Sequence, residues 1–312
     1  MINRRHIRIK VMQSFYALLQ SENQDLKLEE KFLINNINKM QELYLLMLSL
    51  LVEIKNESSR ILLISKQKHL ATQSELNPNQ KFINNSVLMG IIKSPTFQTY
   101  NKNLKTNFWI ENHKFVKIIW EAIATSDVYA TYMESEISSV KDDLNFIENI
   151  YANIIVVNEK LYDLIEDTNI GWVDDFPFVN TWLLKSIKHV NSTNTLRISR
   201  LFRDIDDEKF VLELFRAVLD HHQDFDADID GKTPNWDSDR IAELDLILIK
   251  MALTEFVYFS SIPTKVSINE YLEIAKDYST EKSSIFINGV LDKLLKEYQK
   301  ENKIEKVGRG LL

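Results

Sequence analysis

The stretch IPTKVSINEYLEIAKDY, from Ile262 to Tyr278, and the stretch IFINGVLDKLL, from Ile285 to Leu295, carry the clearest structural signal in this chain. Apolar residues recur in both at intervals of three or four positions, which is the period of a helix with one buried face. The spacing predicts helices over Lys265–Tyr278 and from Glu281 to about Lys300. Their apolar faces comprise Ile268, Tyr271, Leu272, Ala275 and Tyr278 in the first helix and Phe286, Val290, Leu294 and Tyr298 in the second.

Glycine and proline are scarce, which favours long helices along the whole chain. Only six glycines and five prolines occur among 312 residues, and 45% of the residues are hydrophobic. Alternating strand patterns are absent, so we predict an all-α protein. Further helices are predicted over Leu28–Ser65, Asn112–Glu134, Asp142–Glu166, Asp207–His222 and Ser238–Phe259. Irregular structure is expected at Phe97–Asn107, a turn at Gly171–Pro177 before a short helix ending near His189, and a linker at Asn191–Asn194.

Several classes of protein are excluded by chemistry that the sequence lacks. Without cysteine there are no disulfides, thiolate zinc sites or cysteine nucleophiles. No Ser-His-Asp order and no glycine-rich phosphate loop is discernible, so we expect no enzymatic activity and no cofactor. Neither a secretory signal nor an apolar run of about 20 residues that could span a bilayer is visible, so we expect a cytoplasmic protein.

Charge is unevenly distributed along the chain, whose net charge is −7. The first 20 residues contain four Lys/Arg and no acid, and residues 60–117 contain nine Lys/Arg against two acids. Residues 118–312 contain 21 Lys/Arg against 36 Asp/Glu. This local asymmetry, and not the overall charge, indicates an anionic partner for the basic parts.

The basic N-terminal segment RRHIRIKVMQSFYALLQS, from Arg4 to Ser21, is predicted to be a helix. Ile7, Val11 and Phe15 recur at helical spacing and mark its buried face. Cations near a helix N-terminus oppose the helix dipole, at a cost of about a few tenths of a kcal/mol each. Such an unfavourable arrangement indicates a role beyond folding.

Four segments in order resemble the NusB family of transcription antitermination factors. They are the Arg4–Ser21 helix, LELFRAVL (Leu212–Leu219), WDSDRI leading into LILIKMALTEF (Leu246–Phe256), and the closing pair of helices. Each segment is weak alone, but the four together are specific. The resemblance covers the N-terminal helix and the chain from about Lys209 onward. It implies a NusB-like helical bundle with additional inserted helices.

The resemblance also implies a function. Family members bind single-stranded boxA-type RNA together with the ribosomal protein known as NusE, and so support transcription of ribosomal RNA by the polymerase elongation complex. Guanidinium groups suit phosphates and base edges, and aromatic rings can stack unpaired bases. The implied RNA-binding residues are Arg4, Arg5, His6, Arg8, Lys10, Gln13, Tyr16, Lys282, Ser283 and Phe286. The implied partner-binding residues are Arg240, Glu243, Lys250 and Glu255.

The resemblance leaves a long region of the chain unexplained. We expect residues 1–22 and 205–300 to form the NusB-like bundle, residues 23–204 to be a helical insertion that extends it or forms a subdomain, and residues 301–312 to be a flexible tail. The basic part of the insertion, residues 60–117, interleaves lysines such as Lys102 and Lys105 with four aromatic residues. That mixture suits single-stranded RNA, although the aromatics could equally lie in a core. The aromatic residues are Phe97, Tyr100, Phe108 and Trp109.

Two other sites are open alternatives. Asp226, Asp228, Asp230, Gly231 and Asp237 fit the spacing of a calcium loop, but Thr233 and Pro234 do not suit it, and a solvated acidic turn is the other interpretation. The adjacent His221 and His222 could bind a divalent metal or could simply end a surface helix.

Two other functions are also weighed. NusB-type domains occur in front of ribosomal RNA cytosine methyltransferases, but this chain lacks the cysteine and the glycine-rich motif that those enzymes need. The remaining alternative is a helical protein-interaction scaffold of the same fold without sequence-specific RNA binding.

Overall fold

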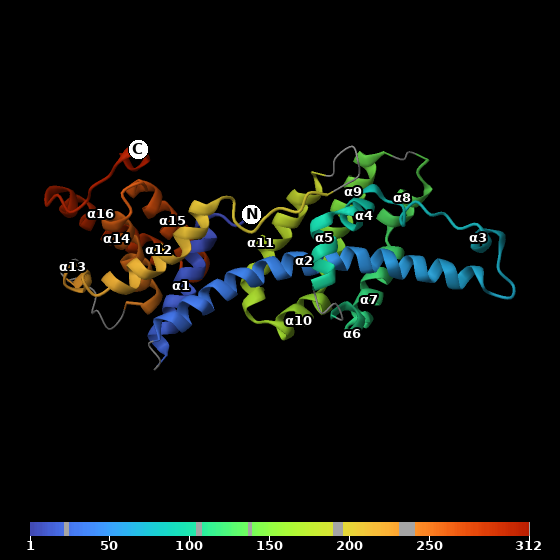
Figure 1. Cartoon of the computed structure of the whole chain (residues 1–312), viewed down its shortest axis with the longest axis horizontal. Coiled ribbons are helices and arrows are strands. Elements are labelled where there is room, and N and C mark those ends of the chain that lie inside the picture. The colour runs from blue at the N-terminus through green and yellow to red at the C-terminus, as the bar shows by residue number, and fades with distance from the viewer. Residues whose placement is uncertain (22–24, 104–107, 137–138, 190–195, 231–240, 312) are drawn as a thin grey trace. The chain divides into compact units, whose positions relative to one another are not determined.

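The computed structural model describes the chain except residues 22–24, 104–107, 137–138, 190–195, 231–240 and 312. Every regular element among the described residues is a helix, which confirms the all-α prediction. The chain divides into two compact units (Figure 1): Met1–Ile37 with Leu201–Leu312, here called the terminal unit, and Asn38–Arg200, here called the central unit.

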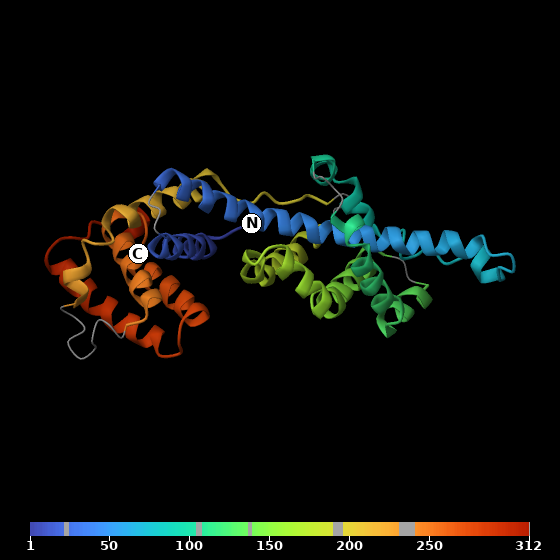
Figure 2. The same ribbon diagram turned by 90° about the horizontal axis from the view of Figure 1, so that it is seen from below.

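The terminal unit brings helices from both ends of the sequence together. In Figures 1 and 2 the first helix, in dark blue, lies beside the orange and red helices of the C-terminal region. It packs against the helices α12, α14 and α15, and α14 also packs against α16. The helices of this unit are α1 (Arg4–Gln20), α12 (Ile205–His221), α13 (Asp226–Asp230), α14 (Glu243–Tyr258), α15 (Thr264–Tyr278) and α16 (Ser283–Lys300).

Helix α14 is the centre of the terminal core. A helix that is apolar on every side is stable only when neighbours cover it on every side, and α14 is such a helix. The amphipathic helices α12, α15 and α16 supply apolar faces for it. The buried apolar residues of α14 are Ile247, Leu248, Ile249, Met251, Ala252, Leu253 and Phe256.

The end of the chain is attached to the terminal unit. Lys306 Nζ donates hydrogen bonds to the main-chain oxygens of Glu255 and Phe259, at 3.0 and 2.9 Å, and Val307 N donates to Ser260 O at 3.1 Å. Glu255 O and Phe259 O also accept main-chain hydrogen bonds from Phe259 N and Ile262 N, so the Lys306 amino group is a second donor to carbonyls at the end of α14. Burial lowers the pKa of Lys306 to about 8. Lys306 and Val307 belong to residues 301–312, for which the sequence suggested a flexible tail.

The central unit surrounds the longer part of α2 (Leu26–Lys66), whose residues 26–37 belong to the terminal unit. Two tryptophans tie later helices to α2: Trp109 Nε1 donates to Leu46 O, and Trp172 Nε1 donates to Lys39 O. The other elements are α3 (Gln73–Leu76), α4 (Ser86–Lys93), α5 (Pro95–Asn103), α6 (Phe108–Glu111), α7 (His113–Ala124), α8 (Asp127–Glu134), α9 (Val140–Ile150), a π-helical turn (Tyr151–Ile155), α10 (Glu159–Thr168) and α11 (Gly171–Ile187).

Two local predictions for the central unit were wrong. Residues 95–103 form the helix α5 where irregular structure was expected, and α11 runs from Gly171 through the position of the expected turn. Pro177 lies inside α11. Its ring costs one helical hydrogen bond, but Trp172, Phe176 and Val179 are buried on either side of it. Tertiary packing of these side chains outweighs the local preference for a turn.

Candidate nucleic-acid interface

The basic residues of α1 lie near its N-terminus, where Asn3 caps the helix by accepting a hydrogen bond from His6 N at 3.0 Å. Arg4 and Arg8 are one helical turn apart and therefore lie on the same side of the helix. Each of the three arginines pairs with a carboxylate on a different helix: Arg4 with α12, Arg5 with α15 and Arg8 with α14. The arginines thus connect the first helix of the chain to three helices of its C-terminal region.

Arg8 forms a buried ion pair with Glu255 in the interior of the terminal unit. Arg8 Nε and Nη2 donate to the two carboxylate oxygens at 2.6 and 2.9 Å. Ser267 Oγ and Tyr271 OH donate to the same carboxylate at 2.6 and 2.8 Å. The Arg8 side chain is 2% exposed and that of Glu255 is fully buried. Four donors on one buried carboxylate compensate for the water that it has lost.

The protonation states of this pair follow from its surroundings. Burial by itself raises the pKa of Glu255, but the charge of Arg8 and the hydrogen bonds from Arg8, Ser267 and Tyr271 outweigh burial and hold that pKa below its ordinary value. Burial also acts to lower the pKa of Arg8, yet the adjacent Glu255 raises it overall. Both groups are therefore charged at neutral pH.

Arg5 and Arg4 form ion pairs closer to the surface. Arg5 Nε and Nη2 donate to the two carboxylate oxygens of Glu270 at 2.9 and 3.0 Å, and this bonding raises the pKa of Arg5. Arg4 Nε donates to Asp207 Oδ1 at 3.0 Å, and its guanidinium lies 4.7 Å from the centre of the Phe210 ring. The side chains of Arg4 and Arg5 are 36% and 35% exposed, so both are accessible to a ligand.

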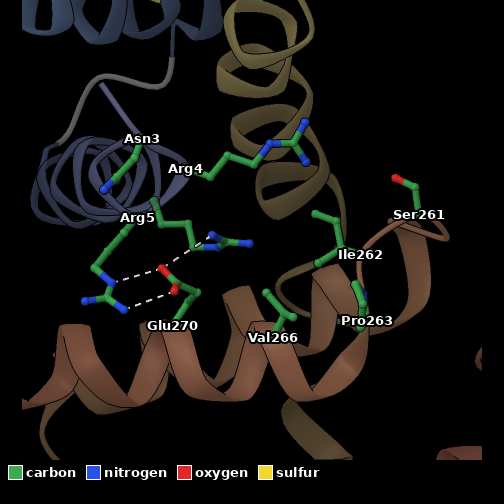
Figure 3. Close-up of a pocket in the computed structure, with 9 residues that line it drawn as sticks. Asn3, Arg4, Arg5, Ser261, Ile262, Pro263, Val266 and Glu270 are labelled. Atoms are coloured by element: carbon green, nitrogen blue, oxygen red, sulfur yellow. Dashed lines mark hydrogen bonds and ion pairs between the residues drawn. The ribbon is translucent and has the colours of Figure 1, made fainter. Parts of the chain in front are cut away.

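A hollow of about 560 Å³ opens beside these two arginines (Figure 3). In the close-up, Arg5 of α1 and Glu270 of α15 point toward each other. Arg4 extends from α1 away from Glu270. An apolar part of the lining comes from the α14–α15 connection and the first turn of α15. The hollow therefore combines guanidinium groups with an apolar surface. Its lining residues are Asn3, Arg4, Arg5, Arg8, Ser261, Ile262, Pro263, Val266 and Glu270.

The other RNA-binding candidates on α1 differ in their access to solvent. Lys10 is buried, like Arg8, so neither side chain presents its charge at the surface as the sequence suggested. His6 and Gln13 are half-buried, and Tyr16 is exposed. Burial, together with the charges of Arg5 and Lys10, lowers the pKa of His6 to about 4, so His6 is neutral at pH 7.

The candidates at the start of α16 lie around a separate small hollow of about 150 Å³. Lys282 is exposed, Phe286 is half-buried and Ser283 is buried. The Ser283 hydroxyl is within hydrogen-bond distance of the hydroxyls of Ser279 and Thr280, at 2.9 and 2.8 Å. Lys282 and Phe286 are thus the two members of this group with surface for a ligand.

The partner-binding candidates do not form one exposed surface. Glu243 is exposed and accepts hydrogen bonds from Gln20 Nε2 at 2.8 and 2.7 Å. Lys250 is mostly buried and pairs with Asp226 at 2.6 Å. Glu255 is the buried partner of Arg8, which corrects the expectation that it would contact another protein directly. Arg240 lies outside the described residues.

The aromatic residues of the basic insertion are mainly structural. Phe97 and Trp109 are buried in the central unit, so their rings are not available to stack on bases. Tyr100 and Phe108 are partly exposed. Lys114 and Lys117 on α7 are exposed. Lys105 and the side chain of Lys102 lie outside the described residues. In the described part of this region, two of the four aromatic rings expected to stack on bases are therefore buried.

The calcium and metal alternatives find no complete site among the described residues. Asp226 pairs with Lys250, and Asp228 Oδ2 accepts a hydrogen bond from Tyr298 OH at 2.5 Å. His221 stacks on Tyr258, with ring centres 3.8 Å apart. In the described ranges no group of three or more His, Cys, Asp or Glu residues is arranged to hold a metal ion. Gly231 and Asp237 lie outside those ranges.

Sequence reasoning did not identify the acids that pair with the arginines. Asp207, Glu255 and Glu270 come from three separate helices, and nothing in their local sequence distinguishes them from solvated acids. It also missed Arg203, whose side chain is 64% exposed and lies 3.3 Å from Asp207. Arg203 therefore adds a surface cation beside Arg4, because the two share one carboxylate.

The fold and the basic helix end define a class of helical bundle, and comparison with known proteins identifies it. The model of the NusB family matches residues 181–296. The chain is 41% identical over 109 residues to the transcription antitermination protein NusB of Chloroherpeton thalassium, a match that covers 35% of this chain and 52% of that protein. It is 40% identical over 112 residues to the NusB of Salinibacter ruber, covering 36% of this chain and 70% of the relative. It is 45% identical over 85 residues to the NusB of Geobacter sulfurreducens, a match that covers 27% of this chain and 62% of that protein.

The chain belongs to the NusB family. It nevertheless spans only about half the length of the first of these relatives, and most of the central unit lies outside the matched region. No solved structure matches the chain. Within the described residues, no helix combines the length and the apolar character needed to cross a lipid bilayer.

Proposed function

We propose that this protein is a non-enzymatic, RNA-binding transcription antitermination factor. In this proposal it binds boxA-like single-stranded RNA together with a NusE-like ribosomal protein and supports transcription of ribosomal RNA. Membership of the NusB family supports the general role, since the relatives described above are named transcription antitermination proteins. A cytoplasmic location would follow from that role.

The observation that carries RNA binding is the hollow beside Arg4 and Arg5. Two partly exposed guanidinium groups border an apolar surface made by Ile262, Pro263 and Val266. Guanidinium groups bind phosphates in a bidentate manner, and an unpaired base can lie against apolar side chains. Because α1 and α15 form the walls, the hollow exists only when the two ends of the chain are folded together.

Arg8 has a supporting role in this proposal. Its guanidinium is occupied by Glu255 in the interior, so it holds α1 against α14 and thereby fixes the direction in which Arg4 and Arg5 point. Lys282 and Phe286 would contact the RNA at a second surface, with Tyr16 as a further exposed ring on α1. The NusE-like partner would use the exposed part of the surface around Glu243.

Salt dependence tests whether the two arginines contact RNA phosphates. For single strands each lost phosphate contact reduces the slope of log K against log salt by about 0.7. We expect Arg4→Ala and Arg5→Ala each to reduce the slope by about this amount in titrations of a labelled boxA-like RNA. Lys296→Ala on the far end of α16 is the matched control for loss of one positive charge. An unchanged slope in the Arg4→Ala/Arg5→Ala double variant removes these residues from the interface.

One observation favours the alternative of a protein-interaction scaffold without sequence-specific RNA binding. All three arginines of the basic helix end are already paired with carboxylates, and those pairs stabilise the fold by themselves. RNA titrations with and without a NusE-like protein separate the two functions. The scaffold binds the protein but discriminates poorly between boxA-like and scrambled RNA, whereas the RNA-binding factor discriminates between them.

A further inference from the structure

The contact between Arg5 and Glu270 has the geometry that a guanidinium would use to hold an RNA phosphate. We infer that Glu270 occupies the phosphate position of Arg5, and that single-stranded RNA binds this protein by replacing the carboxylate. This inference rests on the proposed function. Glu270 is then a residue of the protein itself that lowers the affinity of the site for phosphate groups.

Glu270 and a phosphate cannot occupy the Nε–Nη2 edge of Arg5 at the same time. A guanidinium binds a carboxylate or a phosphate through two parallel N–H groups on one edge. Arg5 Nε and Nη2 are both donated to Glu270, at 2.9 and 3.0 Å. The remaining nitrogen of the guanidinium, Arg5 Nη1, lies 4.0 Å from Glu273 Oε2. A phosphate can therefore bind to this same Nε–Nη2 edge only after Glu270 has moved away.

The Arg5–Glu270 pair can separate because it is partly exposed, whereas the neighbouring Arg8–Glu255 pair cannot because it is buried. The side chains of Arg5 and Glu270 are 35% and 23% exposed, so both can exchange their mutual bonds for water or for a ligand. The Arg8–Glu255 pair is sealed from solvent, and separating it would leave two buried charges unpaired. Only the outer pair is suited to exchange.

The released carboxylate has a second cation within reach. Glu270 Oε2, the oxygen that accepts a hydrogen bond from Arg5 Nε, also lies 3.9 Å from Arg8 Nη1. Glu270 can turn toward Arg8 when a phosphate arrives at Arg5. Glu270 thus lies between two arginines, the buried Arg8 and the partly exposed Arg5.

Competition of this kind means that a phosphate contact alone gives little affinity. When an isolated phosphate binds, the protein gains a contact between Arg5 and the phosphate but loses the contact between Arg5 and Glu270. The net gain in binding free energy is therefore small. A single-stranded RNA gains additional contacts in the same hollow, with Arg4 at one side and with the apolar surface of Ile262, Pro263 and Val266. The carboxylate therefore weakens the binding of every phosphate ligand by the same amount, and a ligand that adds base contacts to its phosphate contact can still bind.

The test is a comparison of Glu270→Gln with Glu273→Gln. Both remove one negative charge from α15 near Arg5, but only Glu270 holds the two-bond contact, because Glu273 pairs with Lys276 at 2.5 Å. The glutamine amide would direct an NH₂ group at one of the arginine donors, so the contact cannot reform. We expect Glu270→Gln to bind a short labelled single-stranded RNA roughly fivefold more tightly than wild type, as expected for an ion pair worth about 1 kcal/mol. Glu273→Gln should change the affinity less than twofold, by about 0.4 kcal/mol or less.

A double-mutant cycle excludes a merely structural effect. In an Arg5→Ala background the gain from Glu270→Gln should disappear, because no guanidinium remains to be released. Inorganic phosphate, used as the competing probe, should displace RNA from Glu270→Gln at lower concentration than from wild type. Thermal unfolding of each variant shows that the fold is retained.

The outcomes separate this inference from the proposed function. If wild type binds RNA but Glu270→Gln binds no more tightly than Glu273→Gln, or keeps its advantage without Arg5, the inference is wrong and the proposed function stands. If neither wild type nor any folded variant binds RNA, the proposed function itself fails.

Discussion

The terminal and central units stabilise their interiors with different chemistry. The terminal unit buries a guanidinium–carboxylate pair, Arg8 with Glu255, among four hydrogen bonds. The central unit also buries a carboxylate, Asp143, but its donors are neutral: Tyr132 OH at 2.5 Å and Ser86 N at 2.7 Å. Around Asp143 lie stacked aromatic rings, with the centres of Tyr132 and Phe146 3.9 Å apart.

The difference shows what each unit has to achieve. A buried ion pair is directional and expensive to separate, so it fixes one helix against another in a single arrangement. In the terminal unit it joins helices from opposite ends of the sequence. In the central unit, stacked aromatic rings hold together helices that are adjacent in sequence, such as α8 and α9.

Breaking the ion pair of the terminal unit should have the largest effect. Arg8→Ala leaves Glu255 charged and unpaired in the interior, and we expect it to lower the free energy of unfolding by about 3–5 kcal/mol. Chemical denaturation followed by circular dichroism measures the loss. A control is Arg216→Ala, because Arg216 and its partner Glu30 are both partly exposed, at 57% and 24%, and such a surface pair contributes little. A loss below about 1 kcal/mol for Arg8→Ala would show that Glu255 is protonated or hydrated, contrary to the comparison.

A smaller effect is expected from the aromatic stack of the central unit. Phe146→Leu keeps most of the apolar volume but removes the ring that stacks on Tyr132, so the free energy of unfolding should fall by about 1.5 kcal/mol. The loss should be the same in low and high salt, because no charge is involved. The loss caused by Arg8→Ala should also persist in salt, but it should shrink as Glu255 is protonated in acid. A salt-dependent loss for Phe146→Leu would contradict the assignment.

The smallest effect concerns pH. The folded-state pKa of His6 is about 4, below its ordinary value of 6.5, so the unfolded chain binds a proton first as pH falls. Stability should therefore be complete above pH 6.5 and decline between pH 6.5 and 4. Because the ring is only half-buried, we expect a contribution of about 1 kcal/mol. Thermal unfolding across this range should show a shallower decline for His6→Gln. Identical pH profiles would show that the imidazole is not desolvated.

Glu255, whose pKa is lowered in the folded state, should cause a further loss of stability only below its ordinary pKa of about 4.5.

The helices with strong apolar periodicity were predictable from sequence to within a few residues. The prediction of Leu28–Ser65 corresponds to α2 at Leu26–Lys66, and that of Lys265–Tyr278 corresponds to α15 at Thr264–Tyr278. In these helices local pattern and tertiary packing agree. At α11 they disagree, because Gly171 and Pro177 signal a turn while the surrounding buried residues require a helix.

The candidate site was predictable only in part. The sequence marked the basic start of α1, and Arg4 and Arg5 do border a hollow. It gave no means to separate them from Arg8, although one of the three is buried and two are accessible. Arg203 was missed because no motif surrounds it.

The amino-acid sequence by itself determined the helical class, the family and the basic end of the first helix, because periodicity, motif order and charge are properties of neighbouring residues. Only the tertiary structure decided what each arginine does. The carboxylates that hold Arg4, Arg5 and Arg8 are 203, 265 and 247 positions away along the chain. Their pairing and burial depend on how α12, α14 and α15 pack around α1, and local sequence carries no record of that packing.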